Sequence, residues 1–137
     1  MNEHSQAAKL SGFQYTNPHV SDFQFKINKE YIPDNDSNSL QIKLNVKKAN
    51  IKSESDGGKQ QYVELNMIIG DENSPFTFNA VIGADFRWSR ELDNETVDNL
   101  INKNAVSLLI GYLRPIISQF TVQAGITPLN LPFIDLT

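Results

Sequence analysis

The sequence contains no cysteine among its 137 residues, so disulfide bonds, cysteine-ligated zinc sites and thiol catalysis are excluded. Histidine is scarce as well: only His4 and His19 are present, and neither has a partner at the spacing of a metal site. The Gly-x-Ser-x-Gly motif of serine hydrolases is absent. Gly57-Gly58-Lys59 resembles part of a phosphate-binding loop, but a hairpin turn explains it better. We therefore expect no enzyme, no metal and no cofactor.

Excess positive charge is also lacking. The chain carries 12 basic and 16 acidic residues, for a net charge of −4. A nucleic-acid-binding surface needs clustered cations, and the nearest approach, Lys43, Lys47, Lys48 and Lys52, is typical of a solvated strand face. The N-terminal ten residues are too polar for a secretory signal, and no apolar run approaches the ~20 residues of a membrane span. We expect a cytoplasmic protein without nucleic-acid or membrane partners.

Alternating apolar and polar residues predict the strands. The chain length suits a single domain over residues 1–137, with 1–12 flexible. Side chains two residues apart share a face, so four stretches of alternating residues read as half-buried strands. They are residues 20–27, 40–47, 63–69 and 76–84. Asp56-Gly57-Gly58 and the stretch 71–75 are turns, and residues 34–39 after Pro33 form a loop. Short links of this kind favour antiparallel neighbours.

From Asn94 the apolar spacing changes to that of a helix. Asp93 or Asn94 is suited to the N-cap, and Gly125 to the C-cap. Pro115 lies inside this helix and removes the backbone hydrogen bond to Gly111, so we expect a bend there. The predicted fold class is α+β: a four-stranded antiparallel sheet packed against one long, kinked C-terminal helix.

This helix is apolar on two sides. One stripe repeats at i, i+3, i+4 and i+7, and Leu108, Tyr112 and Ile116 lie on another face. A helix packed on a sheet buries one stripe, so the second needs another cover. That cover is either another copy of the chain or the apolar tail 125–137, which Pro128 and Pro132 keep extended. We expect Leu108, Tyr112 and Ile116 to form an oligomer interface.

The C-terminal third resembles the SecB family of protein-export chaperones. Tyr112 and Arg114, then Gly125, then the run Pro128 to Leu131 match the family's signature at its spacing. Weaker matches are Phe23, Tyr31-Ile32-Pro33, Phe76, Gly83 or Ala84, and Phe86. The resemblance covers residues 20 to 134. It is to a short variant that lacks the family's last helix.

The resemblance implies a fold, an assembly and a function. Members of the SecB family are cytoplasmic homotetramers built as dimers of dimers, and they serve protein transport and translocation. They bind unfolded, export-competent polypeptides in apolar grooves without ATP and deliver them to the SecA motor. Here Gln24 or Lys26, and Asn79, replace the acidic residues that dock that motor, which puts SecA as a partner in doubt. Shortened relatives serve toxin–antitoxin pairs, so an antitoxin is another expected partner.

Candidate client-binding residues follow from the match to the family's groove. They are Tyr31, Leu40, Ile42, Leu44, Phe76 and Phe86, with Met67 and Trp88 added by residue type and position. For each strand residue, burial in the core is the alternative. Three functions stay open: a general holdase, a dedicated chaperone of one partner, and a small-ligand binding protein that uses a cavity between sheet and helix. The choice between a dimer and a tetramer stays open for each.

Overall fold

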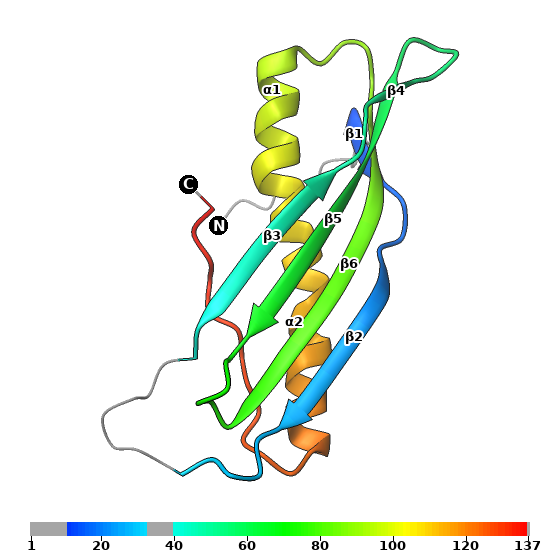
Figure 1. The fold of residues 1–137 in the computed structure, drawn as a ribbon. Helices are drawn as coiled ribbons and strands as arrows, with labels where there is room; N and C mark the ends of the chain where they lie inside the picture. The colour runs from blue at the N-terminus through cyan, green and yellow to red at the C-terminus, as the bar shows by residue number, and fades with distance from the viewer. Residues whose placement is uncertain (1–10, 33–39, 137) are drawn as a thin grey trace, which may run out of the picture.

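One curved sheet wraps around one long helix (Figure 1). The computed structural model describes residues 11–32 and 40–136. The strands are β1 (Phe13–Tyr15), β2 (His19–Ile27), β3 (Ile42–Lys48), β4 (Lys52–Ser53), β5 (Lys59–Ile69) and β6 (Phe76–Trp88). The helix comprises α1 (Asn94–Asn99), a π-helical segment η1 (Leu100–Ala105) and α2 (Val106–Gln123).

Over the described residues the sheet has six strands, so the prediction of four was too low. The four predicted strands are present as β2, β3, β5 and β6, and every pairing is antiparallel. β6 is 13 residues long and pairs with β1 and β2 along one side, while β5 pairs with β3 and β4. β1 and β4 have three and two residues, too few for alternation to reveal them in a sequence.

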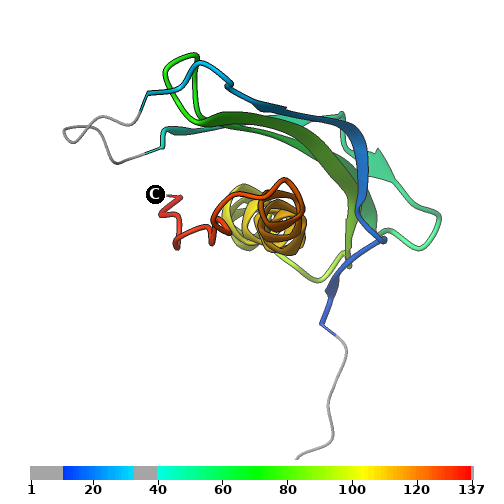
Figure 2. The same ribbon diagram turned by 90° about the horizontal axis from the view of Figure 1, so that it is seen from below.

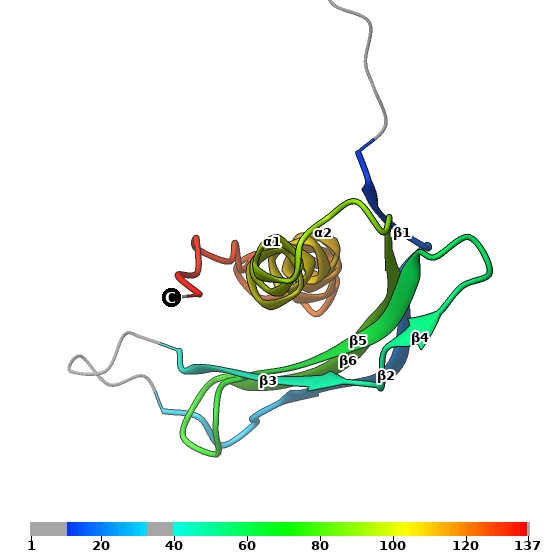
Figure 3. The same cartoon turned by 90° about the horizontal axis from the view of Figure 1, so that it is seen from above.

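The core lies between the concave face of the sheet and the helix (Figures 2 and 3). Alternate residues of β5 and β6 point inward, among them Leu65, Met67 and Phe78, all fully buried. Leu109, Leu113 and Ile117 of α2 meet them with no exposed surface. A period of two on the strands thus faces a period of 3.6 on the helix, which is the pattern that the sequence predicts.

The helix begins and ends where the sequence indicates. Asp93 is the N-cap: its carboxylate accepts a hydrogen bond from the Thr96 backbone N–H at 2.7 Å, which lowers the pKa of Asp93. Gly125 follows the last turn with φ of 82°, the left-handed C-cap conformation. α2 continues through Pro115, so the proline does not end the helix, and the expected kink stays a prediction. Pro115 and Gly111 lie on the exposed side, where water can reach the freed carbonyl.

The helix is also long and apolar enough, by length and hydropathy alone, to cross a membrane. The same test is passed by the core helices of soluble proteins. Here the inner stripe of the helix packs against the sheet in the hydrophobic core, which accounts for part of that apolar character, while Tyr112 and Phe120 stay partly exposed.

Two glycines provide a matched test of the backbone. Gly70 ends β5 with φ of 82°, and a Cβ there would overlap the carbonyl oxygen of Phe76. We expect Gly70→Ala to lower the free energy of unfolding by about 1–3 kcal/mol. Gly111 is helical, with nothing within 4 Å of an added Cβ, so Gly111→Ala should raise it by about 0.5–1 kcal/mol. Urea unfolding monitored by circular dichroism measures the free energy of unfolding of both variants. Equal changes in the two variants would contradict the different surroundings of Gly70 and Gly111.

Candidate functional site: two apolar flanks of the helix

An aromatic cluster joins α2 to the strands on one flank. We use this name for Tyr15, Phe23, Phe25, Tyr112 and Phe120. The rings of Phe23 and Phe120 lie 4.4 Å apart, and those of Phe25 and Phe120 lie 6.2 Å apart. Tyr15 and Tyr112 meet edge to face at 6.4 Å, with their hydroxyls 3.3 Å apart. This hydrogen bond is the first cause of the raised pKa of Tyr112.

The predicted interface residues lie on this flank. Tyr112 keeps 42% of its surface exposed, and Leu108 and Ile116 are half-buried against the core. Tyr15 and Phe120, beside them, are exposed to a similar degree. Such a surface on one protomer is consistent with the predicted contact between copies.

The C-terminal tail covers the opposite flank of the helix. The Arg114 guanidinium donates hydrogen bonds to the carbonyl oxygens of Leu131 and Pro132, the latter at 2.9 Å. The buried Thr121 hydroxyl accepts a hydrogen bond from the Leu129 N–H at 2.9 Å. Leu131 is thereby packed into the core. Of the two covers considered for the doubly apolar helix, the tail is therefore present on one flank. The flank of Tyr112 stays partly exposed on the protomer, and the contact between copies stays a prediction.

A second partly exposed apolar surface runs along β3. We call the inward-facing Leu40, Ile42, Leu44 and Val46 the β3 surface. The first three are half-buried against the core, and Val46 is 42% exposed. At one end of this surface the Lys48 ammonium donates a hydrogen bond to the Asn102 side chain at 2.9 Å. Two predicted client-binding residues, Ile42 and Leu44, therefore lie on an edge strand, and a third, Leu40, directly precedes it.

Four other predicted client-binding residues lie in the core. Met67, Phe76, Phe86 and Trp88 expose between 0% and 6% of their surface. They are inward positions of β5 and β6, the two central strands, and belong to the same core cluster as the buried residues of the helix. Burial in the core, the alternative open for each strand residue, is therefore where the structure places these four, and a client cannot touch them in this conformation.

Tyr31 is half-buried at the end of β2, where its backbone N–H donates to the Asn28 carbonyl at 3.2 Å. Ile32 beside it is 81% exposed, while Pro33 and the predicted loop 34–39 lie outside the described residues. Tyr31 thus borders open surface but is not brought together with the β3 surface by any contact of the described chain. Asn28 itself ties this strand end to the β5–β6 turn through the carbonyls of Glu72 and Ser74.

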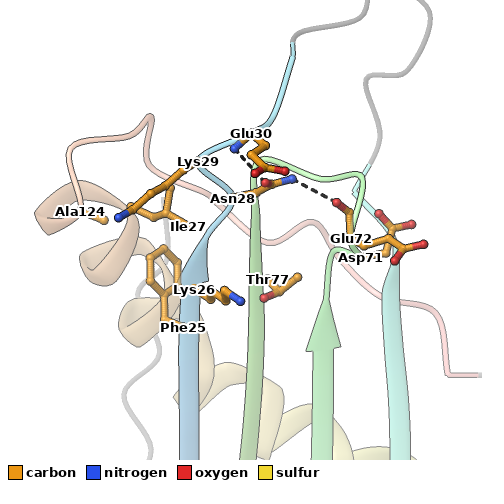
Figure 4. Close-up of a pocket in the computed structure, with 10 residues that line it drawn as sticks. All are labelled: Phe25, Lys26, Ile27, Asn28, Lys29, Glu30, Asp71, Glu72, Thr77 and Ala124. Atoms are coloured by element: carbon orange, nitrogen blue, oxygen red, sulfur yellow. Dashed lines mark hydrogen bonds between the residues drawn. The ribbon is translucent and has the colours of Figure 1, made fainter.

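A cleft of about 1040 Å³ opens at this end of the molecule. Figure 4 shows its lining, which mixes apolar, basic and acidic side chains: Phe25, Lys26, Ile27, Asn28, Lys29, Glu30, Asp71, Glu72, Thr77 and Ala124. It lies beyond the sheet–helix core, because the space between sheet and helix is filled by core side chains. Among the described residues no three His, Cys, Asp or Glu side chains group as a metal site.

The structure adds residues that the sequence reasoning missed. Val46 is the most exposed member of the β3 surface, and Tyr15 belongs to a strand too short to be recognised. On the convex face, the Tyr62 ring lies across Gly83, where any Cβ would overlap it. Burial, followed by the nearby charges of Glu64 and Asp85, raises the pKa of Tyr62. In the sequence, Gly83 is the only signal of this packing of Tyr62.

The fold is similar to that of known structures. No protein-family model and no curated protein matches the sequence. One similar structure is the Mycobacterium tuberculosis SecB-like chaperone Rv1957 in complex with a ChAD peptide from the HigA1 antitoxin: TM-score 0.57, 15% identity, 89% of this chain and 90% of that one. Another is a Streptococcus agalactiae protein of unknown function: TM-score 0.62, 16% identity, 88% of this chain and 97% of that one. At these identities the likeness concerns the fold, and the chain has a SecB-like fold.

Proposed function

We propose that this protein is an ATP-independent, SecB-like holdase that binds non-native polypeptides in the cytoplasm. The observation that carries the proposal is the apolar surface left open on a SecB-like fold. After the helix and the tail have packed, the aromatic cluster and the β3 surface stay partly exposed on either side of α2. Neither surface carries a group of side chains suited to catalysis, and binding is the function that both can perform.

The driving force is the removal of apolar surface from water. An unfolded client exposes apolar and aromatic side chains, and each Å² that it buries on a similar surface contributes ~25 cal/mol. Tyr31, Leu40, Ile42 and Leu44 remain our candidates for client contact, joined by Val46, because each retains some exposed area. A passive cycle of this kind needs neither nucleotide nor cofactor.

A dedicated role is the second candidate. The M. tuberculosis neighbour was solved with a peptide from an antitoxin, and the two chains match over nine-tenths of their length. An antitoxin-like client is therefore a natural partner to test for this chain. A toxin–antitoxin pair encoded next to its gene would favour the dedicated role, and activity on many unrelated clients would favour the general one.

Copies of the chain associate, in this proposal, through the flank of the aromatic cluster. β2 is an edge strand there, and its convex face carries Asp22, Gln24 and Lys26. Antiparallel pairing of two β2 strands centred on Gln24 places Asp22 of each copy opposite Lys26 of the other. The Asn28 N–H donates to the carbonyl of Pro75, directly before β6, so the backbone groups of Phe23 and Phe25 face outward, as this register requires.

Aggregation of several unrelated, chemically unfolded proteins tests the function. Diluted with a molar excess of this protein and without ATP, they should scatter clearly less light than when diluted alone. Val46→Asp, on the β3 surface, should weaken the suppression, whereas Lys52→Asp, on the neighbouring exposed strand β4, should leave it intact. Undiminished scattering from every client, antitoxins included, would end the proposal.

A further inference from the structure

The free edge of β3 presents a row of backbone hydrogen-bonding groups. The Gln41 carbonyl accepts from the N–H of Gly70, directly after β5, and the Ala49 N–H donates to the carbonyl of Tyr62 on β5. In an antiparallel pair such residues alternate, and the β3–β5 register is unbroken from 42 to 48. The odd residues therefore bond to β5, and Ile42, Leu44 and Val46 point their N–H and C=O groups away from the sheet.

No described residue pairs with this edge. Within residues 11–32 and 40–136, the only further strand beside β5 on this side is β4, which pairs with β5 and not with β3. The tail lies on the flank of the helix toward β3, but the backbone groups of Leu129, Leu131 and Pro132 bond to Arg114 and Thr121 on the helix (Figures 2 and 3). Open backbone groups on an edge strand are a template for an added strand.

The side chains along this edge are apolar on one face of the sheet and polar or basic on the other. The residues with outward backbone groups carry the apolar side chains of the β3 surface, on the concave face. The residues between them are Lys43, Asn45 and Lys47, on the convex face. Neither lysine forms an ion pair within the described chain, although Glu64 lies opposite Lys47 on β5. An added strand would meet apolar groups on one face and two unpaired cations on the other.

Resting on the proposed function, we infer that a client segment adds to β3 as an antiparallel strand, with apolar residues alternating with acidic ones. Residues directly opposite each other point to the same face, so the apolar residues pack on Ile42, Leu44 and Val46. The acidic residues come beside Lys43 and Lys47. β2, the other long edge, is less suited, because Phe120 covers its phenylalanines and its convex charges are of both signs.

Lysine on an edge strand can also serve only to keep other strands away. The experiment separates the two roles. The probe is a fluorescent peptide of about ten residues in which valine and glutamate alternate, a length typical of one strand. It is compared with an alternating valine–lysine peptide and with a Val-Val-Glu-Glu repeat of the same composition. Fluorescence anisotropy at low salt gives each Kd.

We expect the alternating valine–glutamate peptide to bind about tenfold more tightly than either comparison peptide. The reason is that its glutamates form two favourable cross-strand pairs with Lys43 and Lys47, in place of unfavourable ones. The double variant Lys43→Glu, Lys47→Glu should reverse the preference toward valine–lysine. The double variant Lys52→Glu, Lys59→Glu changes as many charges at exposed positions of the β4–β5 pair, outside the β3 edge, and should not reverse it.

N-methylation then tests the strand pairing itself. In the inferred register the valine N–H groups point to β3 and the glutamate N–H groups point to solvent. N-methylvaline should abolish binding, whereas N-methylglutamate should preserve it. If the two N-methylated peptides bind with equal Kd, the inference is overturned. It is also overturned if no peptide binds, for example because a second copy of the chain covers this edge. Aggregation suppression by the unmodified protein is measured independently of the peptides. A failure of the inferred strand pairing can therefore be distinguished from a failure of the proposed holdase function.

Discussion

The Tyr112→Glu variant is expected to sediment as a monomer at concentrations at which the native chain is assembled. Tyr112 is the exposed end of the aromatic cluster, and in the proposed assembly it is covered by a second copy. A glutamate carboxylate at this position would be buried in the interface without a partner, at a cost of about 3–5 kcal/mol. That corresponds to a dissociation constant raised by two orders of magnitude or more. Analytical ultracentrifugation over a dilution series measures it.

Ser107→Glu is the matched control, since it adds the same charge to an exposed position of the same helix, away from the aromatic cluster. The register of the β2 contact has its own test. Lys26→Asp should weaken assembly, and adding Asp22→Lys should restore it, because the opposed pairs are then attractive again. A native protein that is monomeric at every concentration would contradict the interface.

Releasing the tail should cost more stability than any surface substitution. Thr121 is fully buried, and its hydroxyl is the acceptor for the Leu129 N–H. Thr121→Val keeps the shape but leaves that N–H without its partner, which should lower the free energy of unfolding by about 1–3 kcal/mol. Arg114→Ala removes two charge-assisted hydrogen bonds to the tail, with a loss of about 1.5–3 kcal/mol.

The two losses should not add. Both side chains hold the same short segment, so once it has left the helix the second substitution removes contacts that are already gone. We expect the double variant to lose clearly less than the sum, together with faster hydrogen exchange at the Leu129 amide. Thr127→Val, exposed in the same tail, should change stability by no more than about 0.5 kcal/mol. Strict additivity would mean that the two residues act independently.

The strands and the helix could be predicted because each is indicated by a pattern of residues that are close in the sequence. Leu65 and Met67 alternate with polar neighbours on β5, and Asp93 and Gly125 mark the helix ends. The site was harder to predict. Ile42 and Phe76 occupy equivalent positions in two alternating strands, yet one lies on an edge and the other under the helix. Alternation shows which face of a strand is apolar and cannot show which strand is central.

By itself, therefore, the sequence determined the strand and helix periods, the helix caps and the surplus of apolar surface on α2. Only the tertiary structure decided which surplus is sealed: the tail covers the flank of Arg114 and Thr121, and the aromatic cluster and β3 surface stay open. The reason is physical. Periodicity depends on neighbours a few residues away, whereas exposure depends on what distant segments of the chain bring against each face.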